Sequence, residues 1–427
     1  MSRGDEMIRK LESDKVQQSL SVLYGSGKET LRAQTERYAK QIRAHESLFG
    51  ERGEIRLISA PGRTEIGGNH TDHNHGRVLA AAVNLDTLCA VTARDDMLVR
   101  FHSEGYAPIT LDLADLNARP EETGTTAALI RGVASGMKDA GYRIGGFDAA
   151  VTSTVAGGSG LSSSAALEVM LTGVLDALYN RFDMPYPERA IISQRAENVF
   201  FGKPSGLLDQ MASAAGGLVT VDFRDTDKPD VRALQYDFAR KGLALVVVAT
   251  GGSHADLTDD YAAIPAEMRE VAAFYGKPFL RGLTAEQLMA DVGKLRQRTT
   301  DRALMRAFHF INENDRVPEQ VKALEEDRIE DFLQLIIASG RSSFMYLQNV
   351  FPSWKDQSLS LALCMAETML GGKGAWRIHG GGFAGTTLNF VPLDMVDEFT
   401  EAMDRAFGSG ASIVLNIRPE GAAELKL

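Results

Sequence analysis

The spacing of apolar and polar residues predicts a chain of mixed helices and strands. Short apolar runs typical of strands cover three stretches of the first half: 55–59, 78–101 and 147–154. Helical spacing is clearest after residue 163, where apolar side chains recur every three or four positions: Leu167, Met170, Leu171, Val174, Leu175 and Leu178. Further helices are expected over three stretches: 1–50 with a break at 25–27, 127–140, and 187–201 with a proline in its first turn.

The second half has a different rhythm. A buried strand is expected at 243–250, followed by mostly helical sequence to about residue 370. After that, the pattern predicts a glycine-rich loop at 379–385, a strand at 387–391 and a helix at 394–407. Because strands and helices do not alternate regularly, the pattern favours an α+β fold over a doubly wound parallel sheet.

Composition narrows the class of protein. The 427 residues are 44% hydrophobic and 24% charged, which is ordinary for globular chains with room for two or three domains. No apolar run reaches about 18 residues, so we expect no membrane span, and the charged N-terminal segment is unlike a signal peptide. A net charge of −11 disfavours a nucleic-acid partner. Cys89 and Cys364 lie far apart in apolar surroundings and are expected to be buried, reduced thiols, which favours the cytoplasm.

A glycine- and serine-rich stretch at 156–166 precedes the clearest helix. Glycines let the backbone approach a phosphate closely, and the N–H groups and dipole of the helix would point at the loop. Serine hydroxyls can donate to phosphate oxygens or bind magnesium. The alternative is a serine cap after a flexible turn. Gly27-Lys28 is rejected as a P-loop, because Val22 and Glu29 stand where that motif needs glycine and serine or threonine.

Residues 61–76 are predicted to form a turn-rich loop after the first strand. The loop places polar side chains among glycines: Arg63, Glu65, Asn69, His70, Asp72, His73, Asn74 and His75. Such side chains suit the recognition of hydroxyl groups better than a core. Two alternatives stay open: a metal site, because three of the eight histidines fall here, or a solvated turn without function.

Two carboxylates and a second glycine-rich loop complete the candidates. Glu197 lies near a helix end, and Asp209 falls in the first turn of a helix that follows Pro204-Ser205-Gly206. One carboxylate could hold magnesium and the other could orient or deprotonate an attacking hydroxyl. The alternative for each is a surface charge or a helix cap. The loop at 379–385 could abut a phosphate loop or be a plain hairpin connection.

Together, and in order along the chain, these segments resemble the GHMP kinases, and within them the galactokinase branch. APGRTEIGGNHTDHNHG resembles the branch signature APGRVNLIGEHTDYNxG, and GSGLSSSAALEV resembles the family's phosphate loop. AENVFFGKPSGLLDQ resembles the stretch with the metal ligand and the catalytic aspartate, and HGGGFAGTTLNFV resembles the third family motif. The match covers the chain from about Ser47 to its C-terminus.

The resemblance implies an α+β fold of two domains with the active site between them. These are an N-terminal α/β domain (ribosomal protein S5-like) over 1–236 and a C-terminal ferredoxin-like α+β domain over 237–427. It also implies transfer of the ATP γ-phosphoryl group to the anomeric hydroxyl of a galactose-like sugar, with Mg²⁺. The expected partners are the sugar and ATP, with no nucleic acid or membrane, and the protein is expected to be a monomer or weak oligomer.

The resemblance also assigns roles. Arg63 and Asp209 match the catalytic pair, although whether the aspartate is a base or only orients the hydroxyl stays open. The positions that match sugar contacts are Asn69, His70, Asp72, Gly206 and Tyr261. The phosphate loop contributes Gly158, Ser159, Gly160, Leu161, Ser162, Ser163 and Ser164. Ser164 and Glu197 match positions that bind magnesium.

Three positions depart from the signature. Glu65 stands where it has asparagine, Asn69 where its glutamate contacts sugar hydroxyls, and His73 where it has tyrosine. An amide can both donate and accept, whereas an ionised carboxylate only accepts. The sugar therefore stays open, with N-acetylgalactosamine and L-arabinose as alternatives to galactose. A non-catalytic galactokinase-like sugar sensor is disfavoured, because the phosphate loop and the catalytic pair are both present.

Overall fold

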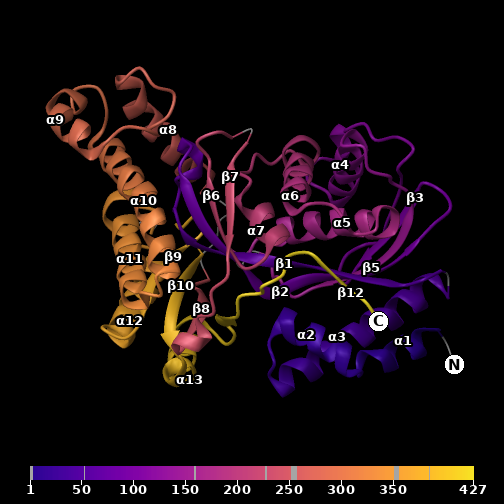
Figure 1. The fold of residues 1–427 in the computed structure, drawn as a ribbon. Coiled ribbons are helices and arrows are strands. Elements are labelled where there is room, and N and C mark those ends of the chain that lie inside the picture. The colour runs from indigo at the N-terminus through magenta and orange to yellow at the C-terminus, as the bar shows by residue number, and fades with distance from the viewer. Residues whose placement is uncertain are drawn as a thin grey trace.

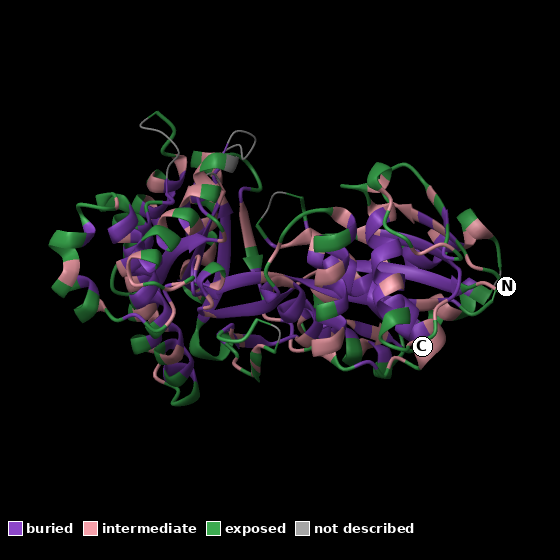
Figure 2. Ribbon diagram, turned by 90° about the horizontal axis from the view of Figure 1, so that it is seen from above, coloured by how far each residue is buried: buried purple, intermediate pink, exposed green. Residues whose placement is uncertain are grey.

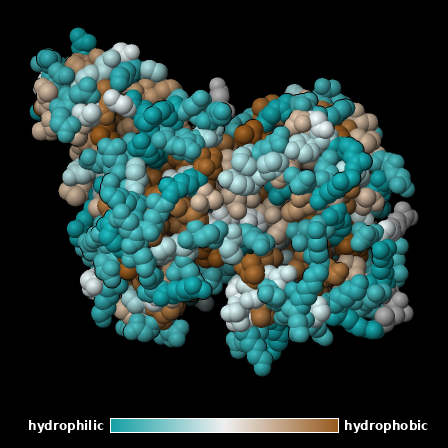
Figure 3. Space-filling model, viewed as in Figure 1, coloured by the Kyte–Doolittle hydropathy of each residue, from teal (hydrophilic) through white to brown (hydrophobic). Residues whose placement is uncertain are grey.

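The computed structural model describes residues 3–51, 53–157, 160–226, 228–251, 257–350, 355–383 and 385–427. The chain forms two bodies that lie side by side, each built on its own sheet (Figure 1). On the face shown in Figure 3 the surface is mostly hydrophilic, and apolar residues gather where the two bodies meet.

The first body is built on an eight-stranded sheet. Its main path runs in the order β12 (Ala423–Leu425), β1 (Arg56–Gly67), β2 (Arg77–Ala93), β5 (Phe147–Ser153), β3 (Leu98–Ser103) and β4 (Ile109–Asp112). β2 is long enough to pair with β5 at one end and with β6 (Leu218–Asp222) at the other, and β7 (Asp230–Leu234) continues from β6. Most pairs are antiparallel, and β3 with β5 is parallel.

Helices cover both faces of this sheet, because its central strands are apolar on both sides. Leu57 and Leu88 pack in one cluster with the N-terminal helices, whereas the adjacent Ile58 and Cys89 pack in another on the opposite face. The helices of the first face are α1 (Arg3–Leu11), α2 (Asp14–Tyr24) and α3 (Lys28–Phe49). Those of the second are α4 (Thr126–Asp139), α5 (Ser163–Asn180), α6 (Tyr186–Arg195) and α7 (Leu208–Ala215).

The second body is built on a four-stranded antiparallel sheet. Its order is β11 (Ser412–Leu415), β8 (Leu243–Ala249), β10 (Thr386–Pro392) and β9 (Ala375–His379). Its helices are α8 (Thr258–Phe274), α9 (Ala285–Leu295), α10 (Asp301–Glu325), α11 (Ile329–Ser342), α12 (Ser358–Leu370) and α13 (Val396–Phe407). Figure 2 shows the buried residues concentrated along the strands of both sheets.

The two bodies share a core. One cluster joins Ile66 and Leu79 of the large sheet to Val247 and Leu388 of the small one. The C-terminal end of the chain also returns to the first body, where Leu425 pairs with Leu57. A division of the chain near residue 236 stays a prediction, and the final strand lies on the first sheet.

The structure confirms the α+β class and most predicted elements. The predicted turn at 61–76 is wrong in its first part, because β1 continues to Gly67 and pairs with β2 through two register shifts. Buried Thr64 and Glu65 take part in this ladder, so their polarity disguised a strand. The helix expected at 187–201 is α6 followed by a π-helical turn over Ala196–Phe201. The expectation of two buried thiols holds for Cys89 and is wrong for Cys364, which is exposed on α12. Among the described residues, no helix combines the length and apolar character needed to cross a bilayer.

Candidate active site

The site is organised around an ion pair between Arg63 on β1 and Asp209 in the first turn of α7. Arg63 Nε donates to Asp209 Oδ1 at 2.6 Å, and Nη2 donates to Oδ2 at 2.8 Å. This bidentate geometry fixes both side chains relative to one another. The sequence separates the two residues widely, and the contact between α7 and β1 brings them together.

The pair lies at the mouth of the serine-rich turn before α5. Arg63 Nη1 donates to the Gly160 carbonyl at 2.5 Å, and the Ser162 hydroxyl donates to Asp209 Oδ2 at 2.5 Å. The backbone N–H of Arg63 also donates to the Leu161 carbonyl at 2.9 Å. Gly62 permits this approach, because a Cβ there would lie 2.6 Å from that carbonyl oxygen. Gly158 and Ser159, which were predicted to bind phosphate, lie outside the described residues.

Asp209 is held in its ionised form. Burial alone would raise the pKa of this carboxyl, but the Arg63 charge and the hydrogen bonds from Arg63 and Ser162 bring the pKa below its usual value. Burial likewise opposes the charge on Arg63, and Asp209 more than offsets that effect, so the pKa of the guanidinium is raised. Asp209 keeps 31% of its side chain exposed, so a substrate can reach the carboxylate.

A second carboxylate, Glu197, lies on the π-helical turn close to the start of α5. Ser164 donates to its Oε1 at 3.0 Å, which brings together the two predicted magnesium ligands. Three residues that sequence reasoning missed also contact it: Lys203 at 2.8 Å, Ser205 at 2.5 Å and Gln210 at 2.9 Å. Their only signal in the sequence was their place in the stretch that carries both carboxylates.

The chemistry of this cluster fits a divalent cation. Mg²⁺ prefers hard oxygen ligands and is commonly held by one or two carboxylates together with substrate phosphates. Ser164 and Glu197 offer such oxygens, and the Lys203 ammonium that pairs with Glu197 Oε1 supplies positive charge where a bound cation would lie. The described residues contain no group of three or more His, Cys, Asp or Glu side chains able to hold a metal. The histidine-rich metal site considered for 61–76 therefore finds no support there.

A second buried carboxyl, which no sequence pattern indicated, lies close to Glu197. Glu168 on α5 is fully buried, and Gln210 Nε2 donates to both Glu168 and Glu197 at 2.9 Å. Burial and the nearby charge of Glu197 raise the pKa of Glu168 to about 8. Glu168 therefore carries a proton near neutral pH, which spares the cluster a second buried negative charge.

A pocket of about 330 Å³ opens beside the Arg63–Asp209 pair. It gathers most of the predicted sugar contacts together with the catalytic pair: Arg63, Asn69, His70, Asp72, Gly206 and Asp209. Glu65, Lys203 and the Gly380–Gly381 backbone complete much of its wall. Tyr261 is not among the described residues that line the pocket. Its hydroxyl donates to the Gly382 carbonyl at 2.8 Å, which places it behind the glycine-rich loop.

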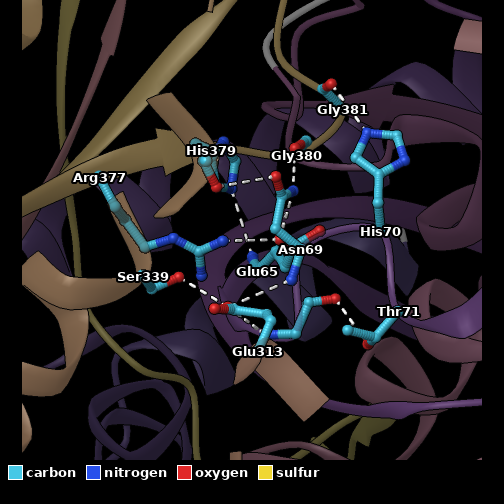
Figure 4. A network of polar contacts seen from close by, with 12 residues as sticks. Glu65, Asn69, His70, Thr71, Glu313, Ser339, Arg377, His379, Gly380 and Gly381 are labelled. Carbon is cyan, nitrogen blue, oxygen red and sulfur yellow. Dashed lines mark hydrogen bonds and ion pairs between the residues drawn. The ribbon is translucent and has the colours of Figure 1, made fainter. Parts of the chain in front are cut away.

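The side-chain amide of Asn69 is bonded on all sides by protein groups (Figure 4). Its Nδ2 donates to Glu65 Oε1 at 3.0 Å and to the Gly380 carbonyl at 2.6 Å. Its Oδ1 accepts from Asn349 at 2.9 Å and from Ser343 at 3.3 Å. These four contacts use both donors and both acceptor positions of a primary amide.

Comparison with known proteins identifies the family. Residues 43–93 match the galactokinase galactose-binding signature, and residues 128–217 match the GHMP kinases N terminal domain. A galactokinase of Streptomyces coelicolor is 34% identical over 357 residues, which cover 82% of this chain and 88% of that protein. One of Streptomyces lividans is 33% identical over 354 residues, which cover 82% and 85%.

Solved structures agree with this relationship. The crystal structure of Lactococcus lactis galactokinase complexed with galactose matches with a TM-score of 0.78 and 25% identity, over 91% of this chain and 99% of that one. A crystal structure of mevalonate kinase has the same fold, with a TM-score of 0.61 and 14% identity over 84% and 98% of the two chains. The ordered motifs, the two-sheet α+β fold and the identity to these relatives agree: the chain belongs to the galactokinases of the GHMP kinase family.

Proposed function

We propose that the protein transfers the γ-phosphoryl group of ATP to the anomeric hydroxyl of galactose, giving galactose 1-phosphate and ADP. The observation that carries this proposal is the bidentate Arg63–Asp209 pair, which lies between the serine-rich turn and the pocket. One side of the pair can meet a phosphate and the other a sugar, as phosphoryl transfer between two substrates requires.

Asp209 acts on the sugar. Its ionised carboxylate accepts a hydrogen bond from the anomeric hydroxyl, and the proton leaves toward it as the new O–P bond forms and the bond from the γ-phosphorus to its bridging oxygen breaks. Arg63 lies within the same pair and offsets negative charge that develops on the transferring group. Ser162 keeps Asp209 aligned through its 2.5 Å hydrogen bond.

The serine-rich turn acts on the nucleotide. Its backbone and hydroxyl groups at the start of α5 suit the ATP phosphates, since a helix N-terminus favours anions. Ser164 and Glu197 are the residues that would hold Mg²⁺, which when bound neutralises charge on the phosphates. Lys203, Ser205 and Gln210 orient Glu197 from three sides.

The direct test is ADP release from Mg-ATP with and without galactose. Asp209→Asn should lower kcat by about 100- to 10,000-fold, because an amide cannot take up the proton or carry the charge. ATP affinity should change little, and the melting temperature shows whether the variant still folds once Arg63 has lost its carboxylate partner. Glu121→Gln, an exposed carboxylate away from the pocket, is the matched control. Near-normal turnover by Asp209→Asn would refute the assignment, and wild-type protein that binds galactose without turnover would favour the sensor.

A different sugar as the phosphoryl acceptor is a second candidate, because of one observation. The pocket wall carries Glu65 and Asn69, so its polar groups are arranged differently from the signature of the family. N-acetylgalactosamine and L-arabinose therefore belong beside galactose in the same assay, under identical ATP and magnesium conditions. A kcat/KM that is higher for either of them would reassign the substrate while leaving the phosphoryl-transfer chemistry in place.

A further inference from the structure

Glu65 presents one free carboxylate oxygen to the sugar pocket. Its Oε1 accepts from Asn69 Nδ2 at 3.0 Å and from Arg377 Nη2 at 3.0 Å. Its Oε2 accepts no hydrogen bond from any described residue, and this oxygen is not sealed off from solvent. Since Glu65 lines the pocket and keeps 12% of its side chain exposed, this oxygen is available to a ligand.

The groups around Glu65 hold it in one orientation. Figure 4 shows the Arg377 guanidinium and the Asn69 amide converging on its carboxylate. Arg377 is fully buried on β9, so it is a fixed partner rather than a mobile surface charge. The Asn69 amide has no donor or acceptor position left for a sugar hydroxyl, because all four are bonded to protein groups: Glu65, Gly380, Asn349 and Ser343.

Glu65 also lies at a useful distance from the reacting end. Arg63 and Glu65 are two residues apart in a regular part of β1, so their side chains leave the same face of the strand. Two strand residues span roughly 6.6 Å, which is about the reach from an anomeric oxygen to the far side of a sugar ring. Glu65 therefore faces a part of the sugar that does not react.

We propose that Glu65 is the specificity-determining carboxylate of the sugar pocket, accepting a hydrogen bond from a hydroxyl remote from the anomeric position, and that Asn69 is its positioning residue. The carboxylate and the amide have exchanged places relative to the galactokinase signature and hydrogen-bond to one another. This inference rests on the proposed function, since it takes a hexose to be the ligand of the pocket.

The test measures binding of galactose and its 2-, 3-, 4- and 6-deoxy analogues by titration calorimetry without ATP. In the wild type, the analogue that lacks the hydroxyl facing Glu65 should bind about 10- to 100-fold more weakly than galactose, as expected for a hydrogen bond to a charged acceptor. Glu65→Gln should weaken the binding of galactose to the level of that analogue, so that the variant binds the two sugars with similar affinity. Glu121→Gln, an exposed control, should leave the pattern unchanged.

Two further variants keep the outcome decisive. Glu65→Gln leaves the buried Arg377 charge without its partner, so the protein could fail to fold. Glu65→Asp keeps a carboxylate at this position but withdraws its oxygens by one methylene. It should also lose the discrimination between galactose and that analogue. Asn69→Ala should weaken the discrimination only in part, because Arg377 still orients Glu65; a structural role alone would not alter the ranking of the analogues.

The possible failures are distinguishable. A wild type that neither binds galactose nor turns over ATP with it defeats the proposed function. A wild type that binds galactose, with discrimination retained in both Glu65 variants, overturns the inference about Glu65. Discrimination that is lost completely in Asn69→Ala and kept in Glu65→Asp would make Asn69 the sugar ligand instead.

Discussion

At the scale of single residues, the state of Asp209 depends on one serine as well as on Arg63. Ser162 has a φ of 60°, in the left-handed region that ordinary side chains rarely adopt, and from there its hydroxyl reaches Asp209 Oδ2. Glycine adopts this conformation without steric cost, so Ser162→Gly removes the hydroxyl while the backbone can keep its conformation. The variant therefore isolates the hydrogen bond.

Ser162→Gly should shift the acid limb of the kcat/KM profile to higher pH. The hydrogen bond favours ionised Asp209 and lowers its pKa, so the loss of the bond raises the pKa. The measurement is kcat/KM for galactose from pH 8 down to the lowest pH at which both proteins stay folded, because the wild-type limb lies below the usual pKa of a carboxyl group. Ser163→Gly is the control, because no described hydrogen bond joins Ser163 to Asp209, and its acid limb should stay where it is in the wild type. If the acid limb of Ser162→Gly also stays in place, Ser162 does not affect the ionisation of Asp209.

Sequence reasoning found the residues that stand in motifs and missed those that arrive from elsewhere. Arg63, Asp209, Ser164 and Glu197 could be predicted, because glycine-rich turns and the family resemblance mark their surroundings. The contact of Arg377 with Glu65 joins positions 312 residues apart, and no local pattern indicates it. Glu168 resembled any charged position of a helix until its burial was known.

At the scale of elements, the approach of β1 to the serine-rich turn places the site. Gly62 lies where the two segments meet, and a side chain there would press on the Leu161 carbonyl and on Val155. The same approach explains why β1 continues through a stretch that looked like a turn: Pro61 and the glycines serve the register shifts and close contacts of a strand. The strand at 375–379 was missed for a related reason, since it ends in the glycine-rich loop.

Gly62→Ala should destabilise the protein by about 1–3 kcal/mol, because the Leu161 carbonyl oxygen, 2.6 Å from the added Cβ, must move to accept the methyl group. It should also lower kcat, since the movement separates Arg63 from the turn. The free energy of unfolding in urea and the kcat measure the two effects. Gly157→Ala is the control: it lies in the serine-rich loop that β1 approaches, and an added Cβ there meets nothing within 4 Å. Equal stability of the two variants would contradict the tight approach.

At the scale of the whole molecule, a buried charge cluster ties the N-terminal helices and the C-terminal return to the large sheet. Asp86 on β2 is fully buried and accepts from Arg37 of α3 at 2.6 Å, Arg418 at 2.8 Å and Tyr24 of α2 at 2.5 Å. The first fifty residues were expected to be helical from their pattern. Their place on the sheet depends on Asp86 and Arg418, which lie far away in sequence, so it could not be predicted.

Asp86→Asn should cost about 3–5 kcal/mol at pH 7, because it leaves two buried guanidinium groups without their carboxylate. Burial would raise the pKa of Asp86, but Arg37 and Arg418 outweigh it and lower the pKa. A lowered folded-state pKa stabilises the protein fully above the unfolded value of about 3.9, and this contribution is lost as pH falls further. The difference in unfolding free energy between wild type and variant, measured in urea from pH 7 to pH 3, should therefore narrow only below about pH 4.

Glu104→Gln, which removes an exposed ion pair with Lys40, should change stability by less than about 1 kcal/mol at every pH. A gap for Asp86→Asn that is small at pH 7 would mean that the N-terminal helices are held by their apolar contacts with the sheet rather than by this cluster.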